Sequence, residues 1–182
     1  MLSFAGLVHA AGFKQTIELF HQAGESGSFF DKSYGYAVFP NVGSGAVGVG
    51  GAYGTGRVYV GGKPVGTVVL KQVSVGFQLG GKVYSEIIFF QDERALADFQ
   101  SGKIEFGADA SAIAVTSAAH AQVGTNGIGT GMSEGQHDAV TQGRFEVGMA
   151  VFIIAKGGLM ASASLAGQTF TFKPLAPQSS TK

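Results

Sequence analysis

The glycine-dense stretch at residues 36–56 constrains this chain more than any other feature of its sequence. An apolar segment containing Val38 and Phe39 leads into Pro40, and glycines then recur at intervals of one to three residues. Glycine lets the backbone reach positive φ and lets another chain or a ligand approach closely, but it offers little packing area and loses much entropy on ordering. The stretch must therefore be held in place by better packed neighbours.

The same region concentrates positive charge. No aspartate or glutamate occurs between Asp31 and Glu86, whereas the basic residues there are Lys32, Arg57, Lys63, Lys71 and Lys82. The whole chain has a formal net charge of +0 and a pI near 6.9, so its overall field does not attract nucleic acid or a membrane. A neutral chain can still present a basic face. We expect the glycine-rich region to form that face.

Length and composition favour one folded, β-rich domain. The chain has 182 residues, 30 of them glycine, and only 13% are charged. The absence of cysteine excludes disulfides, thiolate metal sites and a lipidated cysteine. No apolar run reaches the length of a transmembrane helix.

The apolar N-terminus resembles the end of a secretory signal. Residues 1–10 close on Val8, His9 and Ala10, which places small residues where a signal peptidase needs them, although no basic segment precedes them. An ordinary apolar N-terminus is the alternative. We expect a truncated signal remnant at residues 1–10, one domain at residues 11–174 and a disordered tail at residues 175–182.

Two helices are indicated. Phe13, Ile17 and Phe20 share one face of residues 13–23, and Gly24 follows as a stop signal. Asp92 is a candidate N-cap for a second helix, which ends at Gly102.

Several segments have the alternation and composition of strands. In residues 73–79 the apolar side chains occupy odd positions, which places Gln72 on the polar face. The last three segments, joined by glycines, suggest a C-terminal meander. These features predict an α+β, single-domain fold with an extensive antiparallel sheet, glycine-rich turns and two or three short packed helices. The expected strands are residues 34–39, 57–60, 65–70, 73–79, 82–90, 103–106, 108–123, 144–155, 159–166 and 168–173.

Two motifs imitate catalytic or nucleotide-binding patterns. Residues 43–48 fit GxGxxG, but neither a helix nor a correctly spaced acidic residue follows, as a dinucleotide site requires. Residues 131–135 fit GxSxG near His137 and Asp138, but the match lies in a predicted loop with no strand before it. We therefore expect no enzyme, cofactor, metal site, nucleotide or nucleic-acid partner.

Four motifs occur in the order of a known family. They lie at residues 36–40 with the glycine run ending at Arg57, at 74–80, at 107–111, and at 155–159 followed by 161–165. With these motifs the chain resembles the SYLF family of lipid-binding domains, most closely its exported bacterial members. The resemblance implies an α+β fold, binding of phospholipids including phosphoinositides in some members, and no catalysis. It also implies an exported, periplasmic protein that is peripherally associated with the cell envelope.

The leading hypothesis is a lipid-binding module. Its cations would attract lipid phosphate while two aromatic side chains insert shallowly, and each surface cation would contribute about 1 kcal/mol. The alternatives are scattered solvated lysines on a structural or stress-related envelope protein that binds a protein partner or an internal apolar ligand, and a small outer-membrane β-barrel. The candidate lipid-binding residues are Lys32, Arg57, Lys63, Lys71, Lys82, Phe13 and Phe20.

Overall fold

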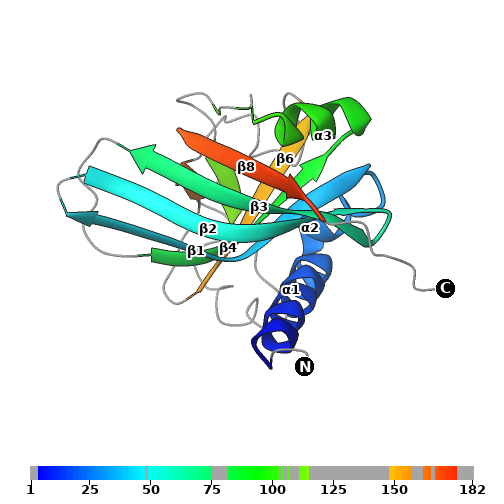
Figure 1. The fold of residues 1–182 in the computed structure, drawn as a ribbon, viewed down its shortest axis with the longest axis horizontal. Coiled ribbons are helices and arrows are strands. Elements are labelled where there is room, and N and C mark those ends of the chain that lie inside the picture. Colours follow the sequence, from blue (N-terminus) through cyan, green and yellow to red (C-terminus); the bar gives the residue numbers. More distant parts are fainter. Residues whose placement is uncertain are drawn as a thin grey trace.

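The computed structural model describes residues 4–47, 49–74, 82–102, 104, 106, 111–114, 148–156, 162–164 and 167–175 (Figure 1). The helices of this part are α1 (Phe4–Gln22), α2 (Gly24–Gly27) and α3 (Glu93–Gln100). Its strands are β1 (Gly35–Val47), β2 (Val49–Val60), β3 (Lys63–Ser74), β4 (Lys82–Phe90), β5 (Ser111–Ala114), β6 (Met149–Ala155), β7 (Ser162–Ser164) and β8 (Gln168–Pro174).

All of these strands belong to one sheet, in the order β7-β5-β6-β4-β1-β2-β3-β8. The paired strands are antiparallel, except that β5 and β6 are parallel. Gln168 on β8 contacts Glu86 on β4 although β1, β2 and β3 lie between these strands in the sheet order. The sheet must therefore curve strongly. The predicted α+β fold with an extensive antiparallel sheet is confirmed.

The glycine-dense stretch forms two long paired strands. β1 and β2 pair from Gly35 with Val60 to Val47 with Val49, so the ladder continues through the glycines. The predicted strands, which ended at residue 39 and began again at residue 57, were therefore shorter than the observed ones. A register shift after Val38 marks a β-bulge beside Pro40, which has no N–H to donate to the ladder.

Two glycines make room for aromatic rings on the inner, concave face of the sheet. A Cβ at Gly56 would collide with the ring of Phe39, and a Cβ at Gly66 would collide with the ring of Phe172. Each ring lies over a strand where a side chain would otherwise stand. Glycine thus allows large rings to fill the space inside the curve.

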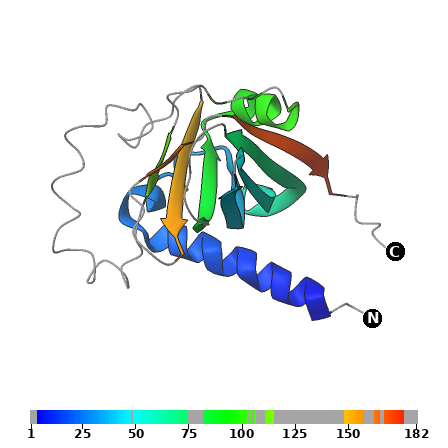
Figure 2. The ribbon, with the colours of Figure 1, turned by 90° about the vertical axis from the view of Figure 1, so that its left-hand side faces the viewer.

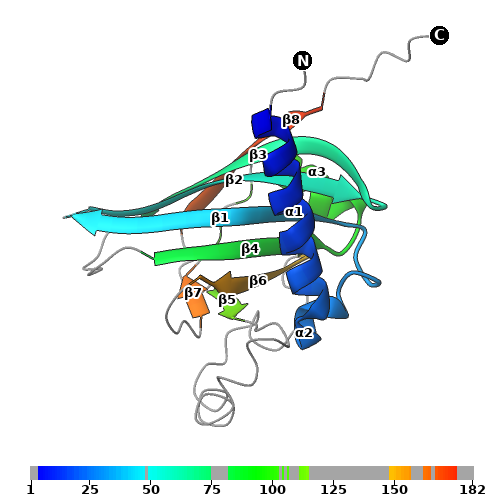
Figure 3. The same cartoon turned by 90° about the horizontal axis from the view of Figure 1, so that it is seen from below.

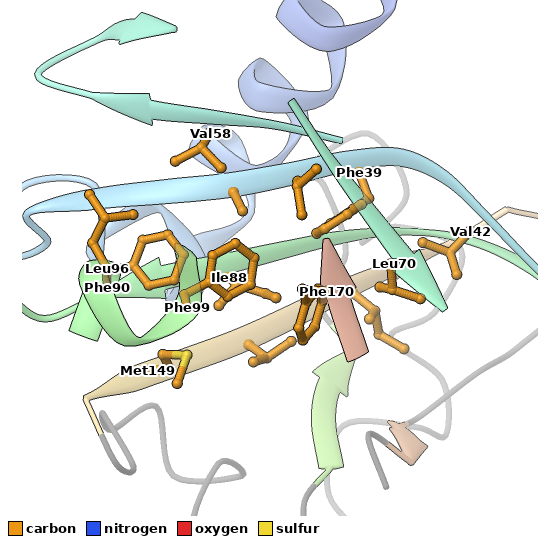
Figure 4. Packing of buried hydrophobic residues seen from close by; sticks show 14 of the residues in the cluster. Phe39, Val42, Val58, Leu70, Ile88, Phe90, Leu96, Phe99, Met149 and Phe170 are labelled. Atoms are coloured by element: carbon orange, nitrogen blue, oxygen red, sulfur yellow. The ribbon is translucent and has the colours of Figure 1, made fainter. Parts of the chain in front are cut away.

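The inner face packs against α3. Asp92 caps this helix as predicted, because its Oδ1 accepts a hydrogen bond from the Ala95 N–H at 2.9 Å. The ring centroid of Phe99 on α3 lies 4.8 Å from that of Phe90 and 4.7 Å from that of Phe170. This inner core contains Phe39, Val42, Val58, Leu70, Ile88, Phe90, Leu96, Phe99, Met149 and Phe170 (Figure 4).

The outer face packs against α1, which lies on the opposite side of the sheet from α3 (Figure 2). The predicted amphipathic helix is present but longer than expected. It begins at Phe4, so it includes most of the segment that resembles a signal remnant. The outer core contains Phe13, Phe20, Ala23, Phe29, Val38, Tyr59, Ile87, Phe89, Ala150, Phe152 and Ile154.

The C-terminal strands lie close to their predicted positions, but the predicted meander is wrong. β7 and β8 occupy opposite edges of the sheet, and β5 lies between β6 and β7. Ile104 and Phe106, expected in a strand, lie outside the strands. Predictions that concern residues 1–3, 48, 75–81, 103, 105, 107–110, 115–147, 157–161, 165–166 and 176–182 fall outside the described residues.

Candidate functional site

Strands β2, β3 and β8 present a polar surface on the side of the sheet that carries α1. Alternate residues on each strand are exposed or half-buried, while those between them are buried or partly buried on the inner face. We define the β2–β3–β8 face as the outward residues Tyr53, Thr55, Arg57, Thr67, Val69, Lys71, Thr169, Thr171 and Lys173.

Strand register arranges these residues in rows across the sheet. Arg57 pairs with Thr67, which pairs with Lys173. Tyr53 pairs with Lys71, which pairs with Thr169. Because neighbouring strands are about 4.8 Å apart, the backbones of Arg57 and Lys173 are separated by roughly 10 Å. Both side chains are long enough to contact one polyatomic anion between them.

The β2–β3–β8 face is electrostatically one-sided. Among all the strands described, the sole acidic residue is Glu86, and its side chain is buried on the inner face. The acidic residues of the α3 region, Asp92, Glu93 and Asp98, belong to the opposite side of the sheet. No carboxylate on a described strand therefore offsets the charge of Arg57, Lys71 and Lys173.

Helix α1 covers only part of the outer face. It crosses the strands, and the ends of β1, β2 and β4 that lie to the left in Figure 3 extend beyond it. Tyr53 on β2 is 55% exposed, and Val83 on β4 is 45% exposed. The surface that carries these two residues is open to solvent.

Arg57 lies at the border between α1 and the open surface. Its guanidinium carbon is 4.5 Å from the centroid of the Phe13 ring, a cation–π geometry. The Nε atom is buried and has no hydrogen-bond acceptor in the described part of the chain. Stacking on Phe13 holds the guanidinium plane in place, and it leaves the positive charge without a carboxylate partner among the described residues.

The predicted cations do not gather in one patch. Arg57 and Lys71 lie on the β2–β3–β8 face, whereas Lys63 follows the Gly61–Gly62 turn at the other end of β3. Exposed Lys32 lies between α2 and β1, with its Nζ 5.7 Å from the Phe29 ring centroid. Lys82 begins β4, and its side chain is outside the described part.

The two aromatic residues expected to insert into lipid are buried in this conformation. Phe13 is 3% exposed and Phe20 is 0% exposed, because both pack between α1 and the sheet. Their insertion into a bilayer would require α1 to leave the sheet.

Sequence reasoning missed Lys173 and the four threonines of this face. Lys173 lies about a hundred residues beyond Lys71, and only the pairing of β3 with β8 brings the two strands together. Thr169, Thr171 and Lys173 do share one strand parity in the sequence, which is the available signal.

Neither a cluster of histidine, cysteine and acidic ligands nor a dinucleotide-binding helix is found among the described residues. No three histidine, cysteine or acidic side chains gather there. Gly43 and Gly45 of the GxGxxG match belong to β1, which continues into the β2 hairpin where a dinucleotide site would need a helix. Within the same part of the chain, no helix is both long and apolar enough to cross a bilayer.

In a scan against protein families, residues 71–176 match Ysc84, described as Las17-binding protein actin regulator. The match covers more than half of the chain. The chain belongs to the Ysc84 family. This confirms the resemblance to SYLF domains, since Ysc84 is the SYLF family. The Ysc84 match contains β3 from Lys71 onward and all of β4 to β8, and it includes both lysines of the β2–β3–β8 face. A search of curated proteins finds no match.

Proposed function

We propose that this Ysc84-family chain is a non-catalytic module that binds anionic phospholipid through the β2–β3–β8 face. Within that class, phosphoinositides are the more specific candidate ligands, because they carry several phosphate groups. The Ysc84 family is one of binding modules, as its description as a Las17-binding protein indicates.

The observation that carries the proposal is the charge of this open sheet surface. Arg57, Lys71 and Lys173 share it with four threonine hydroxyls, and no acidic side chain stands beside them on the described strands. Each basic residue held near an anionic bilayer contributes about 1 kcal/mol of attraction. Hydroxyl groups and stacked guanidinium groups donate hydrogen bonds to phosphate oxygens.

Exposed Tyr53 gives the same surface an amphipathic side chain. A tyrosine has an apolar ring and a polar hydroxyl, so it suits the boundary between lipid and water. The proposal therefore does not need Phe13 and Phe20 to leave the core.

Vesicle co-sedimentation with two matched double variants tests the proposal. We expect wild type to bind vesicles that contain phosphatidylserine or a phosphoinositide, not vesicles of phosphatidylcholine alone, and to dissociate at high salt. Lys71→Gln/Lys173→Gln should weaken binding about tenfold or more, since two cations are lost from the face. The control Lys32→Gln/Lys63→Gln makes the same change of net charge away from the face and should weaken it much less.

Two outcomes would overturn this function. If both double variants weaken binding equally, attraction depends on charge alone and not on the β2–β3–β8 face. If wild type binds none of these vesicles, the face does not recognise lipid, and a protein partner becomes the better candidate, as the actin-regulator description of the family suggests.

We also propose that the protein acts at a bacterial cell envelope, as an exported and peripherally associated protein. The signal-like N-terminal segment and the resemblance to exported bacterial members support this location. Fractionation of the source cells, with the protein expected in the periplasmic fraction, tests it.

A further inference from the structure

A buried polar cluster lies inside the curved sheet, on the face opposite to the proposed lipid surface. It consists of Glu86 on β4, Gln72 on β3 and Gln168 on β8. Glu86 and Gln168 are 0% exposed, and Gln72 is 8% exposed. The surrounding inner core is otherwise apolar, so these groups are costly to bury unless every polar atom finds a partner.

A count of donors and acceptors shows that the cluster is incomplete. The Nε2 of Gln168 donates to Gln72 Oε1 at 3.4 Å and to Glu86 Oε2 at 3.3 Å, which uses both of its hydrogens. Glu86 Oε1 and Gln168 Oε1 are buried, and neither has a hydrogen-bond partner among the residues that the structure describes. Both atoms are oxygens, so what they lack is a donor or a positive charge.

Within the described part of the chain, the carboxylate also lacks a counter-charge. Glu86 has no salt bridge to a described residue, and Tyr84, the nearest titratable side chain on the same strand, is itself buried. Burial raises the pKa of Glu86 to about 8, and the hydrogen bond from Gln168 only partly opposes this rise. A buried negative charge without a partner is unfavourable by several kcal/mol.

The two hydrogen bonds from Gln168 Nε2, to Gln72 Oε1 and to Glu86 Oε2, are both long. Separations of 3.3 and 3.4 Å exceed the range of about 2.7–3.2 Å in which such hydrogen bonds are strongest. Carboxylate and amide oxygens are the ligands that hard cations prefer. One carboxylate carries one negative charge, which matches a monovalent cation better than a divalent one.

We propose that Glu86, Gln72 and Gln168 form an internal binding site for one monovalent cation, an alkali metal ion or ammonium. The cation neutralises the Glu86 carboxylate and serves the oxygens that have no donor. A water molecule would supply hydrogen bonds but no charge. A proton on Glu86 would remove the charge but supply only one donor.

Thermal unfolding of the full chain in different chloride salts tests this site. At about pH 9, where Glu86 is ionised, midpoints are compared in potassium, sodium, ammonium and choline chloride at equal ionic strength. Choline, a bulky quaternary ammonium ion, serves as the control cation. We expect at least one small cation to raise the midpoint by about 2 °C or more over choline, because a ligand of the folded state alone stabilises it.

Two variants locate the effect. Glu86→Gln keeps the shape of the side chain and removes its charge, so the difference between salts should disappear. Glu18→Gln, an exposed position on α1, should keep the difference. Equal wild-type midpoints in all four salts would overturn the site, and so would a difference that persists in Glu86→Gln. The wild-type comparison needs no variant to fold, and it does not depend on lipid binding.

Discussion

The buried carboxyl of Glu86 links the stability of the whole fold to pH. Its pKa is raised from 4.5 to about 8 by burial, whereas in the unfolded chain it ionises near the ordinary value. Between these two values the unfolded state binds fewer protons than the folded state, so raising the pH favours unfolding. The stabilisation that protonated Glu86 contributes is fully present below its pKa in the unfolded chain, and it is lost as the pH rises through about 8, its pKa in the folded protein.

Denaturant unfolding in choline chloride at about pH 5 and about pH 8.5 measures this linkage. The free energy of unfolding of wild type should fall by on the order of 4 kcal/mol between the two values. Glu86→Gln should show little of that fall. A wild type whose stability stays level or increases over this range would contradict a buried, protonated Glu86.

The burial of the three polar residues Gln72, Glu86 and Gln168 could not be predicted from the sequence. Alternation with Val73 placed Gln72 on a polar face, yet it is buried and Lys71 is exposed. A glutamine on an inward position is stable only with partners, and the partners of Gln72 include Gln168, 96 residues away, which in turn contacts Glu86. Local alternation carries no information about such distant pairing.

At the scale of the element, the glycine-rich hairpin depends on missing side chains at particular positions. The sequence indicated that neighbouring segments must hold these glycines, and the structure shows how, with Phe39 over Gly56 and Phe172 over Gly66. The strands within the glycine run were not predicted, because glycine is a poor strand former and only tertiary packing overrides that preference. Asp92, by contrast, carries a local capping signal, and its helix was predicted correctly.

A Cβ at Gly56 should therefore destabilise the fold. In Gly56→Ala the new atom would meet the Phe39 ring and the Val38 carbonyl oxygen, and relief of that overlap costs about 1–3 kcal/mol. We expect the unfolding midpoint to fall by roughly 5 °C. Gly43→Ala on β1 is the matched control, because a Cβ there has no neighbour within 4 Å, and its midpoint should change little. Equal losses in both variants would show that backbone entropy or strand propensity, not the ring contact, explains the glycine.

At the scale of the whole molecule, curvature brings together what the sequence separates. One curved sheet places Gln168 against Glu86 on its inner side and sets Lys173 beside the β3 strand of Lys71 on its outer side. The fold class followed from composition and alternation, but strand order did not. The parallel pairing of β5 with β6 and the separation of β7 from β8 result from long-range pairing, which glycine turns do not specify.

Basic residues gather on the β2–β3–β8 face while the acidic residues lie elsewhere, so we expect lipid binding not to follow the net charge of the chain. The chain has a net charge of +0 and a pI near 6.9, so at about pH 8 it is slightly negative overall, although the β2–β3–β8 face itself contains basic residues and no acidic ones. If the β2–β3–β8 face makes the contact, binding to phosphatidylserine vesicles in about 0.1 M salt should persist from about pH 6 to about pH 8, because at this ionic strength charges more than about 10 Å apart are largely screened. Co-sedimentation across this range measures it, with Lys71→Gln/Lys173→Gln as the variant expected to bind weakly throughout. Binding that disappears as the pH passes the pI would mean that the whole-molecule charge governs association, and the basic face would then lose its role.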